Sequence, residues 1–445
     1  MEQLKGLPLV KILYWIPGLV PLYHFILAWL GAVIYRSPSK KIFVVGVTGT
    51  KGKTTTLEVL NAIFEASGRK TALLSSLRIK IGEKSAKNMI GNTMPGRFYI
   101  QRFLRSAVAE GCKYALIEVT SQGVSASRHR FIDWNSAILT NLAPEHIEAH
   151  GTFKNYREAK LSFLRYVGYG KGKIFLNRDD NNFNFFLNGL KIFKPVVYSH
   201  SDEETQRILP KIYPARSAGD ITPLPFLMSE FNQTNVAAAV ALAKEVGIEE
   251  RAIEEALRHF RGVPGRMEFV QWRPFAIVID YAHTVESLEA VYRVLRQEIK
   301  NSRQHSDGKL ICVLGAAGGG RDKWKRPAMG KVAAEYCDKI LLTNEDPYDE
   351  NPMDIIDQIA AGFLEASGGK YHLPDFEKIF DRGEAIARAI SLASPGDVVV
   401  MTGKGSEDWI HSQMGIKISW SEKGVVEEVL KSLKTKAGET KEAAL

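Results

Sequence analysis

The residues best suited to chemistry near the start of the chain are a lysine and a threonine that follow closely spaced glycines. The stretch VVGVTGTKGKTTTLEV, residues 44–59, reads as a β-branched strand, a glycine-rich turn and a helix. Free N–H groups at such a helix start attract phosphate oxygens. Lys53 would neutralise phosphate charge, and the Thr54 hydroxyl would ligate Mg²⁺. The usual phosphate-loop spacing also expects a glycine where this chain has Val47, so the loop alone leaves its acceptor open.

The elements needed to position such a loop recur along the chain. From about residue 41, short β-branched segments alternate with amphipathic helices, a pattern typical of an α/β fold with a largely parallel sheet. The segment 261–270 carries two glycines and a proline and predicts a domain junction. The predicted strands are 42–47, 114–119, 137–140, 174–176 and 196–198 before the junction, and 276–280, 310–314, 339–343 and 398–401 after it. The predicted helices are 231–246, 285–300, 328–336, 352–366 and 383–393.

Composition indicates a globular protein with an anionic partner. The 445 residues are enough for two or three domains, and 45% of them are hydrophobic and 24% charged. A net charge of +9 favours a nucleotide, phosphorylated substrate, nucleic acid or anionic lipid, without choosing among them. Cys112, Cys312 and Cys337 lie far apart without a C-x-x-C pair. We therefore expect three partly buried thiols, and neither a disulfide framework nor a cysteine-based zinc site.

The first 40 residues form a hydrophobic arm. Lys11 is the only formal charge in residues 7–35, and the uncharged run 19–35 approaches the minimum length of a bilayer-spanning helix. Prolines interrupt the arm, and no A-x-A cleavage site follows, which argues against a secretory signal. Basic residues from Arg36 onward resemble a cytoplasmic flank. We expect residues 7–35 to insert into or lie on a membrane; the alternative is an arm packed on the protein or on a second copy.

The glycine-rich turn resembles a known variant of the phosphate loop. Its form T-G-T-x-G-K-T-T, residues 48–55, is similar to the P-loop of the Mur ligase family, ATP-dependent enzymes that join an amino acid to a carboxylate. The valine at position 47 fits that family's own spacing. Further motifs follow in the family's order: IEVTSQGV (117–124), TNLAPEHIEAHGTFKNYREAK (140–160), SEFNQTNVAAAVALA (229–243), GVPGRME (262–268), VIDYAHTVESL (278–288) and LGAAGGGRDKWKRPAMG (314–330). The resemblance covers roughly residues 40–425.

The resemblance implies ATP and two Mg²⁺ ions as cofactors. The residues implied to bind ATP are Gly49, Thr50, Lys51, Gly52, Lys53, Thr54, Thr55, Asn232, Asn235, Arg266 and Asp280. Those implied to hold metal are Thr54, Glu118, His146 and Lys160, the last as a carbamate derived from CO₂, which turns its cation into an anion. The implied catalytic residues are Lys53, His146, Lys160 and Arg266. The family's reaction passes through an acyl phosphate and a tetrahedral intermediate, and such phosphoryl transfer needs cations and alignment more than a covalent nucleophile.

Other segments resemble the family member that adds the third residue of the peptidoglycan stem peptide. The segment GNTMPGRF, 91–98, resembles the N-T-T-P segment with which that member binds the muropeptide acceptor. The implied acceptor residues are Asn92, Thr93, Met94, Thr120, Ser121 and Arg128. The implied amino-acid residues are Arg321, Glu345, Asp346, Tyr348, Gly403 and Glu407. Tyr348 replaces the arginine of that member's D-N-P-R segment and cannot make a bidentate ionic contact, so diaminopimelate selection is not implied, although Arg321 remains a candidate carboxylate anchor.

The acceptor's carrier stays open at this point. Members that act on UDP-linked muramoyl peptides hold the UDP in an N-terminal domain, whereas barely 40 residues precede this P-loop. The acceptor is therefore either UDP-linked and bound through residues 75–98, or lipid-linked with the arm at the membrane. We expect a cytoplasmic protein, associated with the cytoplasmic face of the membrane in the second case. The expected parts are a hydrophobic arm (1–40), a central P-loop ATPase domain with a mostly parallel sheet (41–264), a C-terminal Rossmann-like α/β domain (265–430) and a flexible tail (431–445).

The sequence is compatible with three other functions. Folylpolyglutamate synthesis is the runner-up within the family, but the N-T-M-P segment (92–95) and the G-K-G-x-E segment (403–407) favour a muropeptide. A non-catalytic ATP-binding module would leave the metal ligands and Lys160 without a role. A nucleic-acid ATPase is suggested by the positive charge alone, without stacking motifs or a basic stripe, so we expect no nucleic-acid partner.

Overall fold

The structure is a computed structural model that describes residues 19–90, 92–144, 150–212, 229–302, 306–320, 323–367 and 376–442. The predicted site residues His146 and Arg321, and the start of the hydrophobic arm, lie outside this described part. The chain divides into two compact units. The first contains the described residues up to 212 together with 230–260, and the second contains Ser229 and those from 261 onward.

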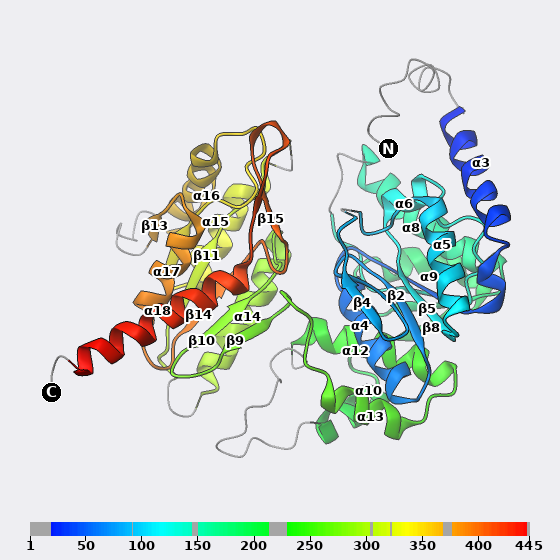
Figure 1. Cartoon of the computed structure of the whole chain (residues 1–445), viewed down its shortest axis with the longest axis horizontal. Helices are drawn as coiled ribbons and strands as arrows, with labels where there is room; N and C mark the ends of the chain where they lie inside the picture. The colour runs from blue at the N-terminus through cyan, green and yellow to red at the C-terminus, as the bar shows by residue number, and fades with distance from the viewer. Residues whose placement is uncertain are drawn as a thin grey trace. The chain divides into compact units, whose positions relative to one another are not determined.

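The first unit is built on an eight-stranded sheet with the order β4-β3-β2-β5-β1-β6-β7-β8 (Figure 1). Strands β2 to β4 pair antiparallel at one edge, and the other neighbours are parallel. The central strands are buried on both faces, as parallel sheets require. The strands are β1 (Phe43–Thr48), β2 (Thr71–Leu74), β3 (Arg78–Ile81), β4 (Lys84–Lys87), β5 (Tyr114–Glu118), β6 (Ser136–Leu139), β7 (Lys173–Asn177) and β8 (Val196–Tyr198).

Helices cover this sheet, and the one that follows the glycine-rich turn is the most deeply buried of those near the site. Helix α4 packs against α12 and α13, and α3 packs against α5. The helices are α3 (Leu19–Ile34), α4 (Lys53–Ala66), α5 (Arg97–Ala109), α6 (Ser121–Ser125), α8 (Phe153–Tyr169), α9 (Phe183–Leu190), α10 (Glu203–Ile212), α12 (Glu230–Glu245) and α13 (Glu250–His259), with short 3₁₀ turns at Pro38–Lys41 and Lys191–Phe193. None of the described helices is long and apolar enough to cross a membrane.

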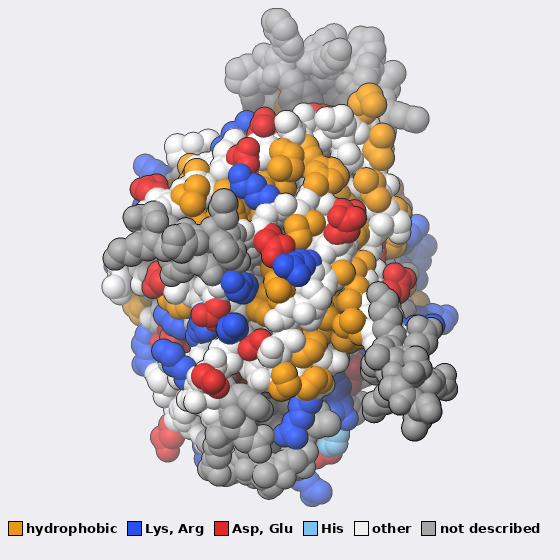
Figure 2. Space-filling view, turned by 90° about the vertical axis from the view of Figure 1, so that its left-hand side faces the viewer, with side chains coloured by type: hydrophobic (Ala, Val, Ile, Leu, Met, Phe, Trp, Pro, Cys, Tyr) orange, Lys and Arg blue, Asp and Glu red, His pale blue; other side chains and the backbone are white. Residues whose placement is uncertain are grey.

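The second unit has a six-stranded sheet with the order β13-β12-β11-β14-β10-β9, in which only β9 runs antiparallel to its neighbour. Its strands are β9 (Glu268–Gln271), β10 (Ala276–Ile279), β11 (Leu310–Leu314), β12 (Lys339–Leu342), β13 (Phe376–Lys378) and β14 (Val398–Met401), with a separate hairpin of β15 (Trp409–His411) and β16 (Lys417–Ser419). Its helices are α14 (Val285–Lys300), α15 (Lys325–Tyr336), α16 (Pro352–Ser367), α17 (Arg382–Leu392) and α18 (Glu422–Glu442), with a 3₁₀ turn at Gln413–Gly415. On the face shown in Figure 2, acidic and basic side chains are interspersed among apolar ones, so the net positive charge is not gathered there.

The α/β fold class and the two largely parallel sheets confirm the prediction, and two local expectations differ from the structure. Cys312 in β11 and Cys337 after α15 form a disulfide, so the prediction of three free thiols is wrong, and only Cys112 is free. The sequence spacing hid this pair because the chain returns through α15 to the strand beside β11. Helix α18 also continues to Glu442 through most of the predicted flexible tail. The polar composition of this segment suggested a tail without secondary structure, but Lys, Glu and Ala are good helix formers.

Candidate active site

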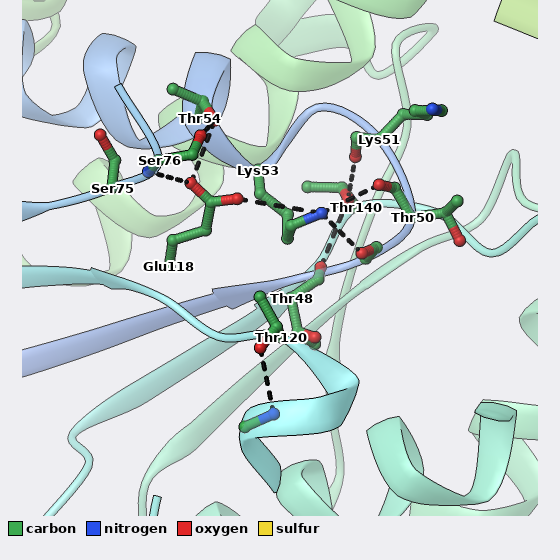
Figure 3. A network of polar contacts seen from close by, with 12 residues as sticks. Thr48, Thr50, Lys51, Lys53, Thr54, Ser75, Ser76, Glu118, Thr120 and Thr140 are labelled. Atoms are coloured by element: carbon green, nitrogen blue, oxygen red, sulfur yellow. Dashed lines mark hydrogen bonds and ion pairs between the residues drawn. The ribbon is translucent and has the colours of Figure 1, made fainter. Parts of the chain in front are cut away.

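Three neighbouring strands end at the glycine-rich turn. Strand β1 lies between β5 and β6, with Val47 paired to Glu118 and Thr48 paired to Leu139. Because all three strands are parallel, their carboxyl ends lie at one edge of the sheet, where open α/β sheets bind ligands. Figure 3 shows the turn after β1, Glu118 at the end of β5 and Thr140 after β6 gathered at this edge.

The backbone of the turn requires glycine at two positions. Gly49 has φ 153° and Gly52 has φ 80°, conformations that side chains rarely adopt. A Cβ at Gly49 would lie 1.9 Å from Thr140 Oγ1, and one at Gly52 would lie 2.2 Å from Asn235 Oδ1. Thr140 Oγ1 also donates to the Lys51 carbonyl at 2.6 Å, which fastens the turn to β6. The turn is therefore held from both sides.

Helix α4 begins directly at Lys53, with Gly52 as its N-cap and no side-chain cap. The first turn carries no acidic residue, so its N–H groups and the helix dipole favour an anion. Lys53 Nζ donates to the carbonyls of Gly49 at 3.0 Å and Thr50 at 2.9 Å, and lies 3.9 Å from Glu118 Oε1. This ammonium group is placed inside the turn, where phosphate oxygens would approach.

Oxygen ligands suited to Mg²⁺ converge beside the lysine. Thr54 Oγ1 donates to Glu118 Oε2 at 3.0 Å and lies 3.0 Å from Ser76 Oγ, while the Ser76 N–H donates to the same carboxylate oxygen at 2.9 Å. Hydroxyl and carboxylate oxygens are the donors that Mg²⁺ prefers. Within the described residues, no three His, Cys, Asp or Glu side chains form a metal cluster. The fit to Mg²⁺ thus rests on Thr54 and Glu118, and Ser76 is a neighbour that the motifs did not indicate.

A fully buried lysine reaches the same turn from helix α8. Lys160 is 1% exposed, and its Nζ donates to the Gly49 carbonyl at 2.8 Å and lies 4.7 Å from the Tyr156 ring centroid. The Tyr156 hydroxyl lies 2.9 Å from Thr50 Oγ1. Burial, and then the charge of Lys160, lower the pKa of His150. Lys53 and Lys160 therefore both donate to the Gly49 carbonyl in the glycine-rich turn, which we call the phosphate turn below.

The two asparagines of helix α12 brace the turn from behind. Asn235 Nδ2 donates to Asn232 Oδ1 at 3.2 Å, and Thr56 Oγ1 donates to Asn235 Oδ1 at 3.4 Å. Both side chains are buried. The structure thus brings Asn235 within contact of Gly52, and Asn232 supports it.

The predicted acceptor residues lie around helix α6. Thr120 is its N-cap and accepts a hydrogen bond from the Gly123 N–H at 3.1 Å, and Ser121 Oγ lies 3.0 Å from His150 Nε2. Arg128 Nη1 donates to the Met94 carbonyl. Asn92 is exposed, Thr93 is half-buried and Met94 is buried. Met94 and Arg128 are therefore joined directly, and Thr120 and Ser121 line the adjoining turn.

In the second unit, the predicted residues from the junction are held together locally. The Arg266 guanidinium lies 4.1 Å from the Tyr281 ring centroid. Asp280 accepts hydrogen bonds from the Met267 and Ala282 N–H groups, each at 2.7 Å. These bonds fix the junction loop against the end of β10.

A buried lysine that the sequence reading missed organises the predicted amino-acid residues. Lys404 Nζ donates to both Asp346 carboxylate oxygens at 2.9 Å and to Glu407 Oε2 at 2.6 Å. Burial lowers the pKa of Lys404, but Glu407 and Asp346 outweigh burial and raise it. The Tyr281 hydroxyl donates to Glu407 Oε1 at 2.9 Å. The segment GKGSE, residues 403–407, contained this lysine, but only Gly403 and Glu407 were assigned a role in it.

Glu345 and Tyr348 flank this cluster. Burial raises the pKa of Glu345 to about 7, and its Oε2 is buried without a hydrogen-bond partner. A Cβ at Gly403, which has φ 105°, would lie 2.2 Å from that oxygen. Tyr348 stacks on His411 with ring centroids 5.0 Å apart. Glu345 therefore presents an acceptor toward the backbone of Gly403, and the Tyr348 ring is held against His411.

Comparisons with known proteins agree with this arrangement. The Mur ligase middle domain matches residues 47–243, and the Mur ligase glutamate ligase domain matches residues 265–405. A UDP-N-acetylmuramoyl-L-alanyl-D-glutamate–2,6-diaminopimelate ligase from Syntrophomonas wolfei is 36% identical, over 86% of this chain and 77% of the relative. A UDP-N-acetylmuramyl-tripeptide synthetase from Roseiflexus is 34% identical, over 88% and 79%. A solved structure of another such diaminopimelate ligase has a TM-score of 0.56 at 24% identity, over 88% of this chain and 79% of that one, and shows the same fold.

Proposed function

The chain belongs to the Mur ligase family of ATP-dependent ligases, and we propose that it joins an amino acid to the C-terminal carboxylate of a muramoyl peptide in peptidoglycan synthesis. The observation that carries this proposal is the phosphate turn, where Lys53, the Thr54–Glu118 pair and the buried Lys160 meet. A binding module would gain nothing from burying a lysine beside these oxygens, because moving a charged group out of water is costly.

The first unit would bind and orient the triphosphate. The N–H groups of the turn and of the start of α4 would hold phosphate oxygens, and Lys53 would exchange its bonds to the Gly49 and Thr50 carbonyls for bonds to phosphate. Thr54 and Glu118 would hold one Mg²⁺, which neutralises charge on the transferring phosphoryl group. The phosphoryl group passes to the peptide carboxylate, and the acyl phosphate then loses phosphate when the incoming amine attacks. Arg266 and Asp280 are also proposed to bind nucleotide, as the family resemblance implies.

Lys160 is proposed to act as a carbamate. As an ammonium group it adds a second cation to a site that must also accept a metal. Capped with CO₂, it would present an anion and, with His146, hold a second Mg²⁺. Its complete burial and its position 2.8 Å from the Gly49 carbonyl support this role. Ammonium groups that stay charged prefer exposed positions.

The second unit is proposed to hold the amino acid between Glu407, Asp346, Glu345 and Tyr348. The carboxylates of Asp346 and Glu407, balanced in part by Lys404, suit an incoming amino group. Tyr348 favours a side chain that stacks on an aromatic face over one that ends in a carboxylate. We do not assign the amino acid beyond that preference.

The acceptor's carrier is proposed to involve the N-terminal arm. Helix α3 exposes large apolar side chains, with Leu22, Trp29 and Val33 each about half exposed. Lys40 and Lys41 follow it, and this combination of an apolar helix face and adjacent cations suits an anionic membrane surface. We propose that the arm contacts the cytoplasmic face of the membrane. We also propose that the arm ends at residue 40, the central domain at residue 264 and the C-terminal domain at residue 430, with the tail after it.

The test is an ADP-release screen. UDP-linked and lipid-linked muramoyl dipeptides would each be offered with diaminopimelate, lysine, ornithine or ammonia. ADP release that requires both an acceptor and an amine, with the ligated product seen by mass spectrometry, is the expected result. Bound ATP without ADP release under every combination would reject the ligase and favour a binding module.

A further inference from the structure

Among the described residues, two arginines beside the acceptor residues have no carboxylate partner. Arg97 is the first residue of α5, and Arg128 follows α6. Arg97 Nη2 donates to the Ala126 carbonyl, and Arg128 Nη1 donates to the Met94 carbonyl. The Nε atoms of both are buried without a hydrogen-bond partner, and neither forms an ion pair within the described residues. Two half-buried guanidinium groups are thus held by backbone carbonyls without a neutralising carboxylate among the described residues.

The surroundings of these arginines favour an anion. Burial lowers the pKa of Arg97 to about 10, with Arg128 as the next cause, so the two charges lie close enough to repel. Helix α5 begins at Arg97 with Gly96 as its N-cap, without a side-chain cap or an acidic residue in its first turn. Its 13 residues orient a helix dipole with its positive end at the cluster. Neither charge is compensated by the described protein.

Helix α3 packs beside this pair of arginines. A Cβ at Gly31 would lie 3.7 Å from the carbonyl of Arg97, so the two helices approach closely there. The rings of Phe25 and Phe131 are 4.9 Å apart, which anchors α3 beside the loop after α6. His24 on α3 has a buried Nδ1 without a hydrogen-bond partner, and burial, then Arg97 and Arg128, lower its pKa. The hydrophobic arm therefore brings an imidazole to the two arginines.

We propose that Arg97, Arg128 and His24 bind the diphosphate that links the muramoyl sugar to its carrier. This site rests on the proposed function and adds the carrier's charged group to it. Two guanidinium groups carry a charge of +2, which matches a diphosphate better than the single charge of a carboxylate. Guanidinium groups also match phosphate oxygens through paired N–H donors. The bond from Arg128 to the Met94 carbonyl places the site next to the acceptor segment 91–98. In this chain, helix α3 would then help to bind the diphosphate of the acceptor.

The test compares acceptors with and without the diphosphate. Equilibrium binding of UDP-linked muramoyl dipeptide, its polyprenyl-lipid-linked form in detergent micelles, and the muramoyl dipeptide without diphosphate would be measured on the full chain. Arg97→Gln should weaken the diphosphate-bearing acceptors about 10-fold or more, because a buried charged contact is lost. Binding of the diphosphate-free acceptor should stay within about twofold. Arg102→Gln is the matched control, since Arg102 lies exposed on the same helix and its guanidinium stacks on Tyr99.

Each outcome decides the proposal. Selective weakening of both carriers supports it, and weakening of one carrier supports it and identifies the carrier used. Equal weakening of all three acceptors, or of none, overturns it, as does failure of the unmodified protein to prefer diphosphate-bearing acceptors. Thermal unfolding of both variants checks that they fold. Because binding needs no turnover, absence of ADP release in the screen above would reject the ligase while leaving this comparison readable.

Discussion

Replacing Lys160 by alanine separates its charge from its structural role. Lys160 Nζ donates to the Gly49 carbonyl, but Lys53 Nζ donates to that same oxygen at 3.0 Å, so the carbonyl keeps a partner in the variant. The stability cost should therefore come mainly from the side-chain stem lost from a 1% exposed position, on the order of 2 kcal/mol. Ligation should fall much further, by about 100-fold or more, because the variant lacks the group that we propose holds and orients metal.

The assay exploits the space that the alanine leaves. If the missing group is an anion, formate or acetate should restore part of the ADP release, whereas chloride at equal ionic strength should not. Lys160→Met fills the same space without an anion, so it should be inactive and resist rescue. Lys154→Ala, an exposed position on the same helix, should change neither activity nor stability appreciably. Activity of Lys160→Ala within about threefold of the unmodified protein would refute the role given to Lys160.

Three further changes test other parts of the structure. Gly52→Ala should lower the free energy of unfolding by about 1–3 kcal/mol and weaken ATP binding, because the new Cβ would clash with Asn235 in addition to straining the backbone. Gly68, with φ 74° and open space around it, is the control, and Gly68→Ala should lower stability through backbone strain alone. Chemical unfolding measures the stability of both variants, and nucleotide titration measures their ATP binding. Glu345 has its pKa raised to about 7 in the folded state, so the folded protein holds a proton that the unfolded chain loses above about pH 4.5. Stability should therefore fall as pH rises from about 4.5 to 7, by on the order of 3 kcal/mol relative to Glu345→Gln, and parallel unfolding curves for the two proteins would contradict this. Tyr348→Arg should raise kcat/KM for diaminopimelate relative to lysine by about 10-fold, and an unchanged ratio would remove residue 348 from selectivity.

Local patterns predicted much of the fold, because each depends on residues close in sequence. The strand 310–314 and the helix 285–300 have the expected bounds, since β-branched runs and amphipathic repeats specify them directly. The strands at 78–81 and 84–87 were missed because lysines and an arginine give them little apolar signal. The Cys312–Cys337 bond was missed because strand adjacency, which the sequence does not state, brings those residues together.

The candidate site was predictable where a motif names its residues. The positions of Lys53, Thr54 and Glu118 at one edge of the sheet agree with the predicted phosphate loop. Ser76 and Lys404 were not predicted, because each acts through partners distant in sequence, as in the bond from Ser76 to Glu118. Motifs therefore name candidate ligands, while tertiary contacts show which residues hold those candidates in place.

Charge balance at the phosphate turn links these observations to the chemistry. Lys51, Lys53 and Lys160 belong to or contact the turn, and Glu118 is the acidic partner described there. Three ammonium groups would attract a triphosphate strongly but would also repel the Mg²⁺ that its transfer requires. A carbamate on Lys160 changes the charge of that side chain from +1 to −1. Lys53 then remains to neutralise phosphate, and the buried end of the site becomes anionic where a cation must sit. The proposed carbamate would therefore turn Lys160 from a phosphate-attracting group into a metal-holding one, which is why added carboxylate should replace it in Lys160→Ala.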